Sequence, residues 1–183
     1  FHLKDSVGRT WQCGTIQLDF AQPENFDLEY VTPEGTKERP VMIHRTIYGS
    51  LERFLGIPSE HYAGEFPVWL APVQVVVIPI SERHTKYARD VVAGLVPASE
   101  KATTRVATTN IRVEVDDRDE TMQAKIRDAQ LQKIPYMLVV GDREVEKNEV
   151  SVRLRSGEDL KSMPLEKFIE RISEIINSKS LEL

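Results

Sequence analysis

Residues 74–80 read QVVVIPI, an almost continuous apolar run in which four β-branched residues follow one another. A strand that is buried on both faces of a sheet has this composition, because neither face needs polar side chains. We expect a helix at about residues 85–95, a strand at 110–117 (NIRVEVDD), a helix at 119–133 and a second buried strand at 136–141 (YMLVVG). Strands that alternate with helices indicate a mostly parallel sheet with helices on its faces.

The end of the chain continues this alternation. Residues 149–155 (EVSVRLR) are expected to form an edge-type strand, and residues 165–177 a helix whose first turn suits Pro164. Apolar residues recur in that helix at helical spacing: Leu165, Phe168, Ile169, Ile172, Ile175 and Ile176. Residues 96–109 are polar and rich in threonine, so we expect an extended loop or insertion there.

The first third of the chain has a different pattern, in which turn signals separate short strand-like segments. We expect strands at residues 10–20 (TWQCGTIQLDF), 26–31 (FDLEYV) and 40–44 (PVMIH). A helix should follow at about residues 46–55, with its apolar residues on one face. These segments predict an antiparallel sheet with a helix packed on it. The change of pattern near residues 64–72 indicates a domain boundary.

Composition limits the kind of protein. The chain has 183 residues, of which 40% are apolar and 29% charged, as in a folded globular protein. It contains no apolar stretch near the ~20 residues of a membrane span. A single cysteine, Cys13, excludes an intramolecular disulfide framework and suits a reducing compartment. The net charge of −5 argues against nonspecific coating of nucleic acid, but not against a specific RNA contact.

Residues 39–53 (RPVMIHRTIYGSLER) place His44, Arg45 and Arg53 at one corner between a strand and a helix. A hydrophobic core has no use for three such side chains, whereas sites that hold anions or metal ions do. Two plainer interpretations stay open at this point. Arg53 could be a surface arginine, and His44 a hydrogen-bonded core histidine.

Several separated segments carry a family resemblance: WQCGTIQLDF, RPVMIHRTIYGSLERFLG, FPVWLAPVQVVVIPI, VDDRDE, KIRDAQLQKIPYMLVVGDREVE and VSVRLRSG. Together they resemble the threonyl-tRNA synthetase family over nearly the whole chain, apart from about residues 96–109. The resemblance implies that residues 1–70 are the C-terminal part of an α+β, antiparallel-sheet class II catalytic domain that includes its third motif. It implies that residues 71–183 are an α/β anticodon-binding domain with a mostly parallel mixed sheet.

The third motif of this family binds ATP, and Arg53 matches its arginine. Activation of threonine requires a carboxylate to attack the α-phosphorus of ATP, so a fixed guanidinium is needed to stabilise negative charge in the transition state. The resemblance therefore implies a catalytic role for Arg53, with ATP bound as its Mg²⁺ complex. It also places Ser50, Gln12, Thr15 and Gln17 at the ATP and threonine pocket. The plainer interpretation of the last three is an ordinary polar strand face.

His44 resembles the histidine that binds the zinc ion of this family. Zinc distinguishes threonine from valine because only threonine has a hydroxyl group to coordinate. A catalytic zinc needs three protein ligands and an open position. The resemblance implies that the other two ligands lie earlier in the full-length protein. Cys13 does not match the family's cysteine ligand and is not assigned as one.

The second domain should read the anticodon. The resemblance implies base contacts for Asp119, Arg127, Glu144 and Arg153, because guanidinium and carboxylate groups can pair with base edges exposed in a tRNA loop. Taken singly, these residues are as well explained by a solvated charged face. Asp119 stands where the family usually has asparagine, and it also suits the N-cap of the helix predicted after it.

The predicted function is therefore that of a threonine–tRNA ligase. It would form threonyl adenylate and transfer threonine to tRNA(Thr), as a cytoplasmic homodimer or, in some family members, in an organelle. We expect neither a membrane nor DNA as a partner, and we expect this chain by itself to be inactive. A catalytically inactive synthetase-like module that binds tRNA or protein is the alternative. A third possibility, another class II synthetase of similar architecture, is made less plausible by the motif MIHR, whose His44 suits a zinc-dependent threonine pocket.

Overall fold

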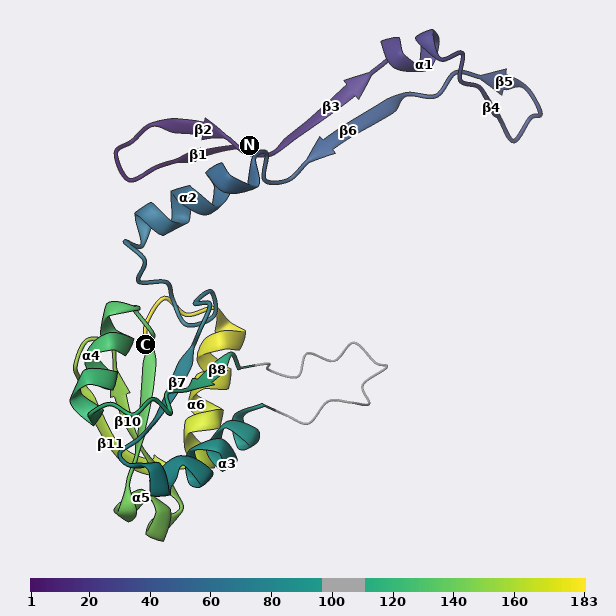
Figure 1. Cartoon of the computed structure of the whole chain (residues 1–183). Coiled ribbons are helices and arrows are strands. Elements are labelled where there is room, and N and C mark those ends of the chain that lie inside the picture. Colours follow the sequence, from purple (N-terminus) through teal and green to yellow (C-terminus); the bar gives the residue numbers. More distant parts are fainter. Residues whose placement is uncertain (97–110) are drawn as a thin grey trace. The chain divides into compact units, whose positions relative to one another are not determined.

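The computed structural model describes residues 1–96 and 111–183, so the predicted loop over residues 96–109 lies outside it except for Val96. The chain separates into two compact units, Phe1–Gly64 and Glu65–Leu183 (Figure 1). Among the described residues, no helix combines the length and the apolar character that a membrane crossing requires.

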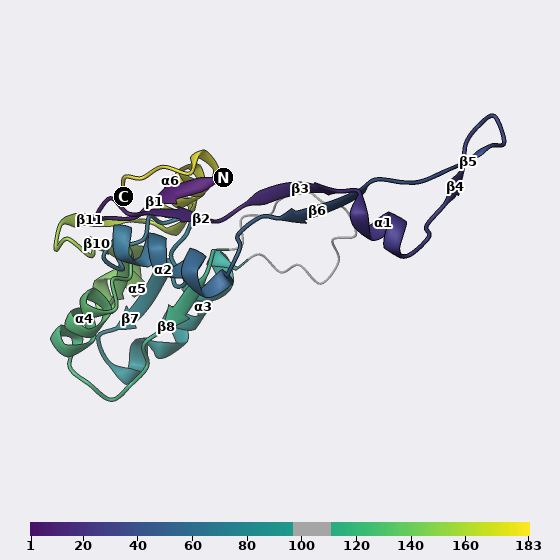
Figure 2. The ribbon, with the colours of Figure 1, turned by 90° about the horizontal axis from the view of Figure 1, so that it is seen from above.

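Residues 1–64 form two-stranded antiparallel sheets. The pairs are β1 (His2–Lys4) with β2 (Thr10–Gln12), β3 (Thr15–Asp19) with β6 (Met42–Thr46), and β4 (Tyr30–Val31) with β5 (Lys37–Glu38). The helices of this unit are α1 (Ala21–Asn25) and α2 (Leu51–His61). Figure 2 shows β3 and β6 as an extended ribbon, with α1 and the β4–β5 hairpin at its far end. The predicted antiparallel pairing of this part of the chain is confirmed.

The strands of this unit are shorter than the sequence pattern suggests. The predicted strand over residues 10–20 is broken beside Gly14, between β2 and β3. A Cβ atom on Gly14 would lie 2.9 Å from the carbonyl oxygen of Ile47, so the backbones pass each other this closely only because position 14 is glycine. Of the predicted strand over residues 26–31, only Tyr30–Val31 is paired, and α1 is a helix that the pattern did not indicate.

The predicted start of the next helix at residue 46 is wrong. Thr46 still belongs to β6, where it pairs with Thr15. The chain then turns through Gly49, whose φ of +69° is left-handed, and α2 begins at Leu51. Ser50 is its N-cap, because the Ser50 Oγ atom accepts a hydrogen bond from the Arg53 backbone N–H at 3.3 Å.

The second unit is built on a five-stranded sheet of order β11-β10-β9-β7-β8. The strands are β7 (Val75–Pro79), β8 (Val113–Val115), β9 (Tyr136–Val140), β10 (Glu149–Leu154) and β11 (Asp159–Pro164). β7 is parallel to both β8 and β9, whereas β10 is antiparallel to β9 and to β11. The helices are the 3-10 turn η1 (Glu82–His84), α3 (Thr85–Leu95), α4 (Met122–Leu131), α5 (Asp142–Lys147) and α6 (Leu165–Ser178). The sheet is mixed, as predicted.

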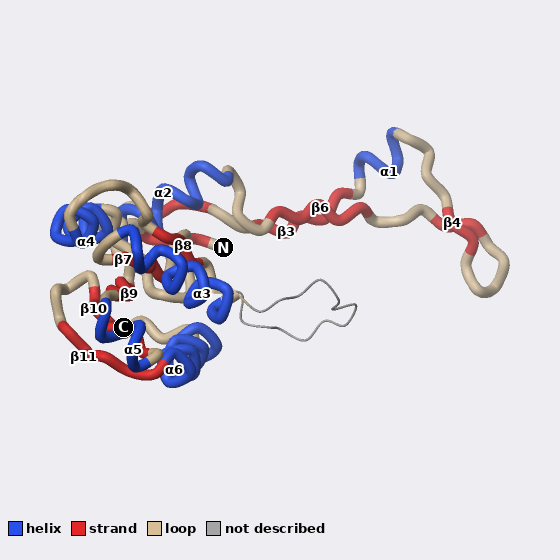
Figure 3. Tube along the Cα trace, turned by 60° about the horizontal axis from the view of Figure 1, so that its bottom comes forward, coloured by secondary structure: helices blue, strands red, loops and turns tan. Residues whose placement is uncertain are grey.

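Helices cover both faces of this sheet (Figure 3). Along β7, Val75 and Val77 pack into a core with α3 and α6, whereas Val76 and Ile78 pack into a smaller core with α4. Figure 1 shows α3 and α6 on one side of the strands and α4 on the other. The QVVVIPI run is thus apolar throughout because both faces of β7 are buried.

Four features of the second unit differ from the sequence-based predictions. β10 is not an edge strand, because β11 pairs with it and forms the edge. β11 has the mostly polar sequence DLKSMP, which an edge strand tolerates and which hides it from a search for apolar alternation. α5, with the sequence DREVEK, is too short and too charged to show helical periodicity. The helix predicted from residue 119 begins instead at Met122.

Candidate functional site

The register of the β3–β6 ribbon decides which predicted residues share a face. Gln17 is paired with His44, and Thr15 with Thr46, and paired residues of an antiparallel sheet point to the same side. The ribbon therefore has a polar face that carries Thr15, Gln17 and His44. Its opposite face carries Ile16, Leu18 and Ile43, each about 60% exposed in this chain. Arg45 pairs with Ile16 and therefore also lies on this second face, away from His44. The alternation thus separates a polar, ligand-suited face from a mostly apolar one that carries one arginine.

His44 is held on the polar face by Asp19. The His44 Nε2 and Asp19 Oδ2 atoms are 2.9 Å apart, and the His44 side chain is 45% exposed. The other carboxylate oxygen, Asp19 Oδ1, accepts hydrogen bonds from the backbone N–H groups of Ala21 at 2.9 Å and Gln22 at 3.0 Å. The Gln22 amide and the His44 side chain lower the pKa of Asp19. An open hollow lined by Gln17, Asp19 and His44 lies beside this pair.

The described residues supply His44 but no complete metal site. No group of three or more His, Cys, Asp or Glu side chains in residues 1–96 and 111–183 is placed to hold a metal ion. Cys13 is buried and forms no disulfide, and among the described residues it does not join His44 in any such group. His44 nevertheless fits a role as one ligand, because metal-binding histidines usually donate their second ring N–H to a carboxylate, as His44 does to Asp19.

The corner between β6 and α2 carries Ser50 and Arg53. The Ser50 hydroxyl donates to Glu52 Oε2 at 2.8 Å while it caps the helix. Arg53 is exposed, and its guanidinium carbon lies 5.0 Å from the centre of the Trp11 ring. That distance is within the range of a cation–π contact. Gln12 follows Trp11 in β2, and its side chain is exposed.

Trp11 is itself fixed by a buried carboxylate. Asp5, whose side chain is 1% exposed, accepts hydrogen bonds from Trp11 Nε1 at 2.9 Å and from Arg9 Nε at 2.6 Å. Desolvation raises the pKa of Asp5, but the hydrogen bonds from Trp11 and Arg9 outweigh it and lower the pKa to about 2. Contacts thus run from Asp5 through Trp11 to Arg53, and no sequence motif indicated this connection.

Glu144 and Arg153 are both placed toward one face of the second unit's sheet. Val150 and Val152 of β10 face the core with α3 and α6, so Arg153 faces the opposite side. The Arg153 Nε atom is buried there and has no hydrogen-bond partner among the described residues. Glu144, in α5, reaches the same face, because its Oε1 atom accepts a hydrogen bond at 3.2 Å from Ser162, which pairs across the ladder with Ser151.

The geometry of Glu144 is set by two donors on opposite carboxylate oxygens. The backbone N–H of Gly141 donates to Glu144 Oε2 at 3.0 Å, and the Ser162 hydroxyl donates to Glu144 Oε1. A Cβ atom at Gly141 would lie 2.5 Å from Ile80 Cδ1 and 3.3 Å from Glu144 Oε2. Glycine at this position therefore leaves the space in which the carboxylate is held.

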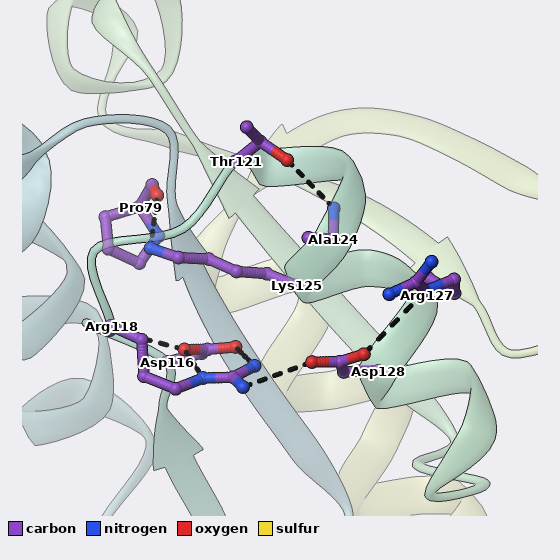
Figure 4. A network of polar contacts seen from close by, with 8 residues as sticks. All are labelled: Pro79, Asp116, Arg118, Thr121, Ala124, Lys125, Arg127 and Asp128. Carbon is purple, nitrogen blue, oxygen red and sulfur yellow. Dashed lines mark hydrogen bonds and ion pairs between the residues drawn. The ribbon is translucent and has the colours of Figure 1, made fainter.

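Arg127 lies elsewhere in this unit, on α4 (Figure 4), and Asp119 precedes that helix. Arg127 lies on α4 with a side chain that is 74% exposed, and its nearest ionic partner is Asp128 at 3.9 Å. Asp119 lies in the turn before α4 and lines a hollow at the carboxyl end of β7. The predicted N-cap role of Asp119 is wrong, because Thr121 Oγ1 accepts the capping hydrogen bond from the Ala124 N–H at 3.3 Å.

The turn that carries Asp119 is tied to α4 by Arg118, a residue that the sequence analysis did not single out. The Arg118 guanidinium donates two hydrogen bonds to Asp116, at 2.8 and 2.7 Å, and a third to Asp128 at 3.1 Å (Figure 4). The Arg118 guanidinium lowers the pKa of Asp116, and both carboxylates raise the pKa of Arg118. The alternating charges of VDDRDE were the available signal for this network.

Residues 74–175, which include the whole of this sheet and the sites of Glu144 and Arg153, match the family model described as the anticodon binding domain. The chain belongs to the anticodon binding domain family. Residues 1–62 match the model of the class II tRNA synthetase core domain for G, H, P, S and T. The anticodon binding domain thus follows a class II core segment in one chain, which is the fold class that the sequence predicted.

Relatives of known name support the same family. The chain is 60% identical to the threonine–tRNA ligase of Caldanaerobacter subterraneus subsp. tengcongensis and 55% identical to that of Desulforamulus reducens, each over 99% of this chain. A crystal structure of the RNA binding domain of threonyl-tRNA synthetase from Cryptosporidium parvum Iowa II covers 94% of this chain and 41% of its own, with 37% identity and a TM-score of 0.77. The predicted resemblance to threonyl-tRNA synthetases is confirmed. The chain spans about a quarter of the length of the curated relatives it matches.

Proposed function

We propose that the chain supplies one wall of the catalytic site and the anticodon binding domain of a threonine–tRNA ligase. The observation that carries the proposal is the 60% identity over nearly the whole chain, which includes both a class II core segment and an anticodon binding domain. The domains we propose are residues 1–70 and 71–183. Homodimerisation of the full-length protein and a cytoplasmic or organellar location stay predictions.

Arg53 is proposed as the catalytic arginine of the adenylation step. The threonine carboxylate attacks the α-phosphorus of ATP, and pyrophosphate leaves with its Mg²⁺, so negative charge has to be stabilised as it shifts between oxygens. The Arg53 guanidinium lies over the Trp11 ring, and this contact can hold the guanidinium in place. Its N–H groups can then donate to a phosphate group, and the face turned away from Trp11 can stack on adenine. Ser50, Gln12, Thr15 and Gln17 are proposed to line the same pocket.

The polar face of the β3–β6 ribbon is proposed to bind the threonine side chain. Gln17 and His44 are cross-strand partners there, so an amide and an imidazole lie side by side. His44 would be one of three ligands of a zinc ion, and zinc, when bound, supplies Lewis-acid recognition of the threonine amino and hydroxyl groups. The remaining ligands would come from parts of the protein outside this chain.

The sheet face that carries Glu144 and Arg153 is proposed to receive the anticodon bases of tRNA(Thr). A guanidinium can donate to a base edge, and a carboxylate can accept from a base amino or imino group. Glu144 is preoriented by Gly141 and Ser162. The Arg153 Nε atom is buried without a hydrogen-bond partner among residues 1–96 and 111–183, which suits recognition of a ligand. Arg127 and Asp119 are proposed to contact the same tRNA from α4 and the turn before it.

A chimera tests this proposal against an inactive binding module. The chain would replace the matching quarter of the Caldanaerobacter ligase. We expect the chimera to catalyse threonine-dependent exchange of pyrophosphate into ATP and to charge tRNA(Thr). The isolated chain should do neither, because it lacks the rest of the active site. A folded chimera that binds tRNA(Thr) but gives no exchange would favour the binding module instead.

A further inference from the structure

Asp19 is held more rigidly than a surface carboxylate usually is. Its Oδ1 atom accepts two backbone hydrogen bonds at the start of α1, from Ala21 and Gln22, and these fix the plane of the carboxylate. Its Oδ2 atom is thereby aimed across the ribbon at His44 Nε2, 2.9 Å away. The Asp19 side chain is 21% exposed, against 45% for His44, and both residues line the hollow.

This geometry determines which ring nitrogen of His44 carries the proton. An ionised carboxylate can only accept hydrogen bonds, so Nε2 must be the protonated, donating nitrogen. In a neutral imidazole the other nitrogen, Nδ1, then has a free lone pair. A metal ion binds imidazole through such a lone pair, so Asp19 leaves Nδ1 as the ligating atom.

We propose that Asp19 is a positioning residue that fixes the tautomer and ring orientation of His44, so that Nδ1 is presented to a divalent zinc ion. The inference rests on the proposed zinc role of His44 and adds to it a residue and an atom. A carboxylate partner of this kind strengthens metal binding because it orients the ring and raises its basicity, and its loss typically weakens affinity about 10–100-fold.

The substitution Asp19→Asn distinguishes this role from simple support of the fold. An asparagine at this position keeps an Oδ1 atom that can accept the hydrogen bonds from the Ala21 and Gln22 N–H groups, because an amide oxygen is also an acceptor. Its amide NH₂ group then faces His44 Nε2 and donates to it. Nε2 becomes the acceptor, the proton moves to Nδ1, and the metal-binding lone pair disappears although both hydrogen-bonding contacts remain.

The experiment measures zinc retention by the chimera during competition with a chromophoric chelator, for wild type, Asp19→Asn, Asp19→Ala and the control Asp27→Asn. Asp27 is a second carboxylate of the same unit, and it pairs with Arg39 at 3.2 Å. We expect about 10–100-fold weaker zinc binding in Asp19→Ala, a larger loss in Asp19→Asn, and no change in Asp27→Asn. Alanine removes the acceptor for the Ala21 and Gln22 N–H groups but leaves the His44 tautomer free, so a purely structural role predicts the reverse order.

The outcomes separate this inference from the proposed function. Zinc that is bound equally by wild type and Asp19→Asn, or a greater loss in Asp19→Ala than in Asp19→Asn, overturns the positioning role of Asp19 alone. A wild-type chimera that holds no zinc overturns the zinc role of His44 and this inference with it. Melting temperatures of the variants show whether a loss of zinc merely follows unfolding.

Discussion

Replacement of Trp11 by leucine should weaken ATP binding by the full-length chimera, through Arg53. The Arg53 guanidinium lies 5.0 Å from the Trp11 ring centre and is exposed, and exposed cation–π contacts contribute about 0.5–1 kcal/mol. If that contact holds the guanidinium in its ATP-binding position, its loss should raise the KM for ATP about two- to fivefold. The KM for threonine should change little, because Trp11 contacts Arg53, whereas the threonine side chain is proposed to bind on the polar face of the β3–β6 ribbon.

The assay is pyrophosphate exchange at varied ATP concentration, with wild type, Trp11→Leu, Arg53→Ala and the double variant. Because Trp11 is argued to act through Arg53, the double variant should be no worse than Arg53→Ala. Trp69→Leu is a matched control, since Trp69 also packs against a cation, Lys179, at 6.0 Å but in the other unit. Equal KM values for ATP in wild type and Trp11→Leu, or strictly additive effects of the two changes, would refute the reasoning.

The remaining predictions concern stability and tRNA recognition. The pKa of Asp5 is lowered to about 2 in the folded chain, so its contribution to the free energy of unfolding should be complete above about pH 4 and lost as pH falls toward 2. The melting temperature of Asp5→Asn should therefore depend less on pH in this range than that of wild type. Phe168→Ala should cost about 3–5 kcal/mol in a denaturant titration, because Phe168 is fully buried and packs edge-on against Tyr136. Thr121→Ala should cost about 1 kcal/mol, whereas a substitution of Asp119 by asparagine should not change stability. Arg153→Ala should cost about 1–3 kcal/mol in binding of tRNA(Thr), with little loss toward other tRNAs.

Each of these predictions has an outcome that contradicts it. If the melting temperatures of Asp5→Asn and wild type fell equally steeply below pH 4, another group would be responsible for the pH dependence there. Leu131→Ala, at a 72% exposed position, is the control for the core, and a cost similar to that of Phe168→Ala would disprove the packing argument. If Arg153→Ala weakened all tRNAs alike and flattened the salt dependence, Arg153 would contact phosphate rather than a base.

Some elements could be predicted from local sequence because burial on both sides leaves a one-dimensional trace. β7 and β9 are apolar at every position, and the apolar stripe of α6 repeats at helical spacing around Phe168 and Ile172. β11 and α5 left no such trace, because an edge strand and a six-residue exposed helix can be polar without loss of stability. The family motifs likewise indicated the candidate site residues, because each motif is a short segment of consecutive residues.

The sequence by itself determined the class of the protein and the side chains available for its chemistry. It predicted an α/β sheet domain after residue 70, an antiparallel segment before it, and His44, Arg53, Glu144 and Arg153 as residues to examine. Only the tertiary structure decided their partners. The strand register places Asp19 and His44 on one face of the ribbon, where they form a hydrogen bond. Trp11 of β2 contacts Arg53 of α2, and Ser162 of β11 donates a hydrogen bond to Glu144 of α5. Such contacts join residues that are distant in the chain. They depend on strand register and on the packing of whole elements, and a local sequence pattern does not specify either of these.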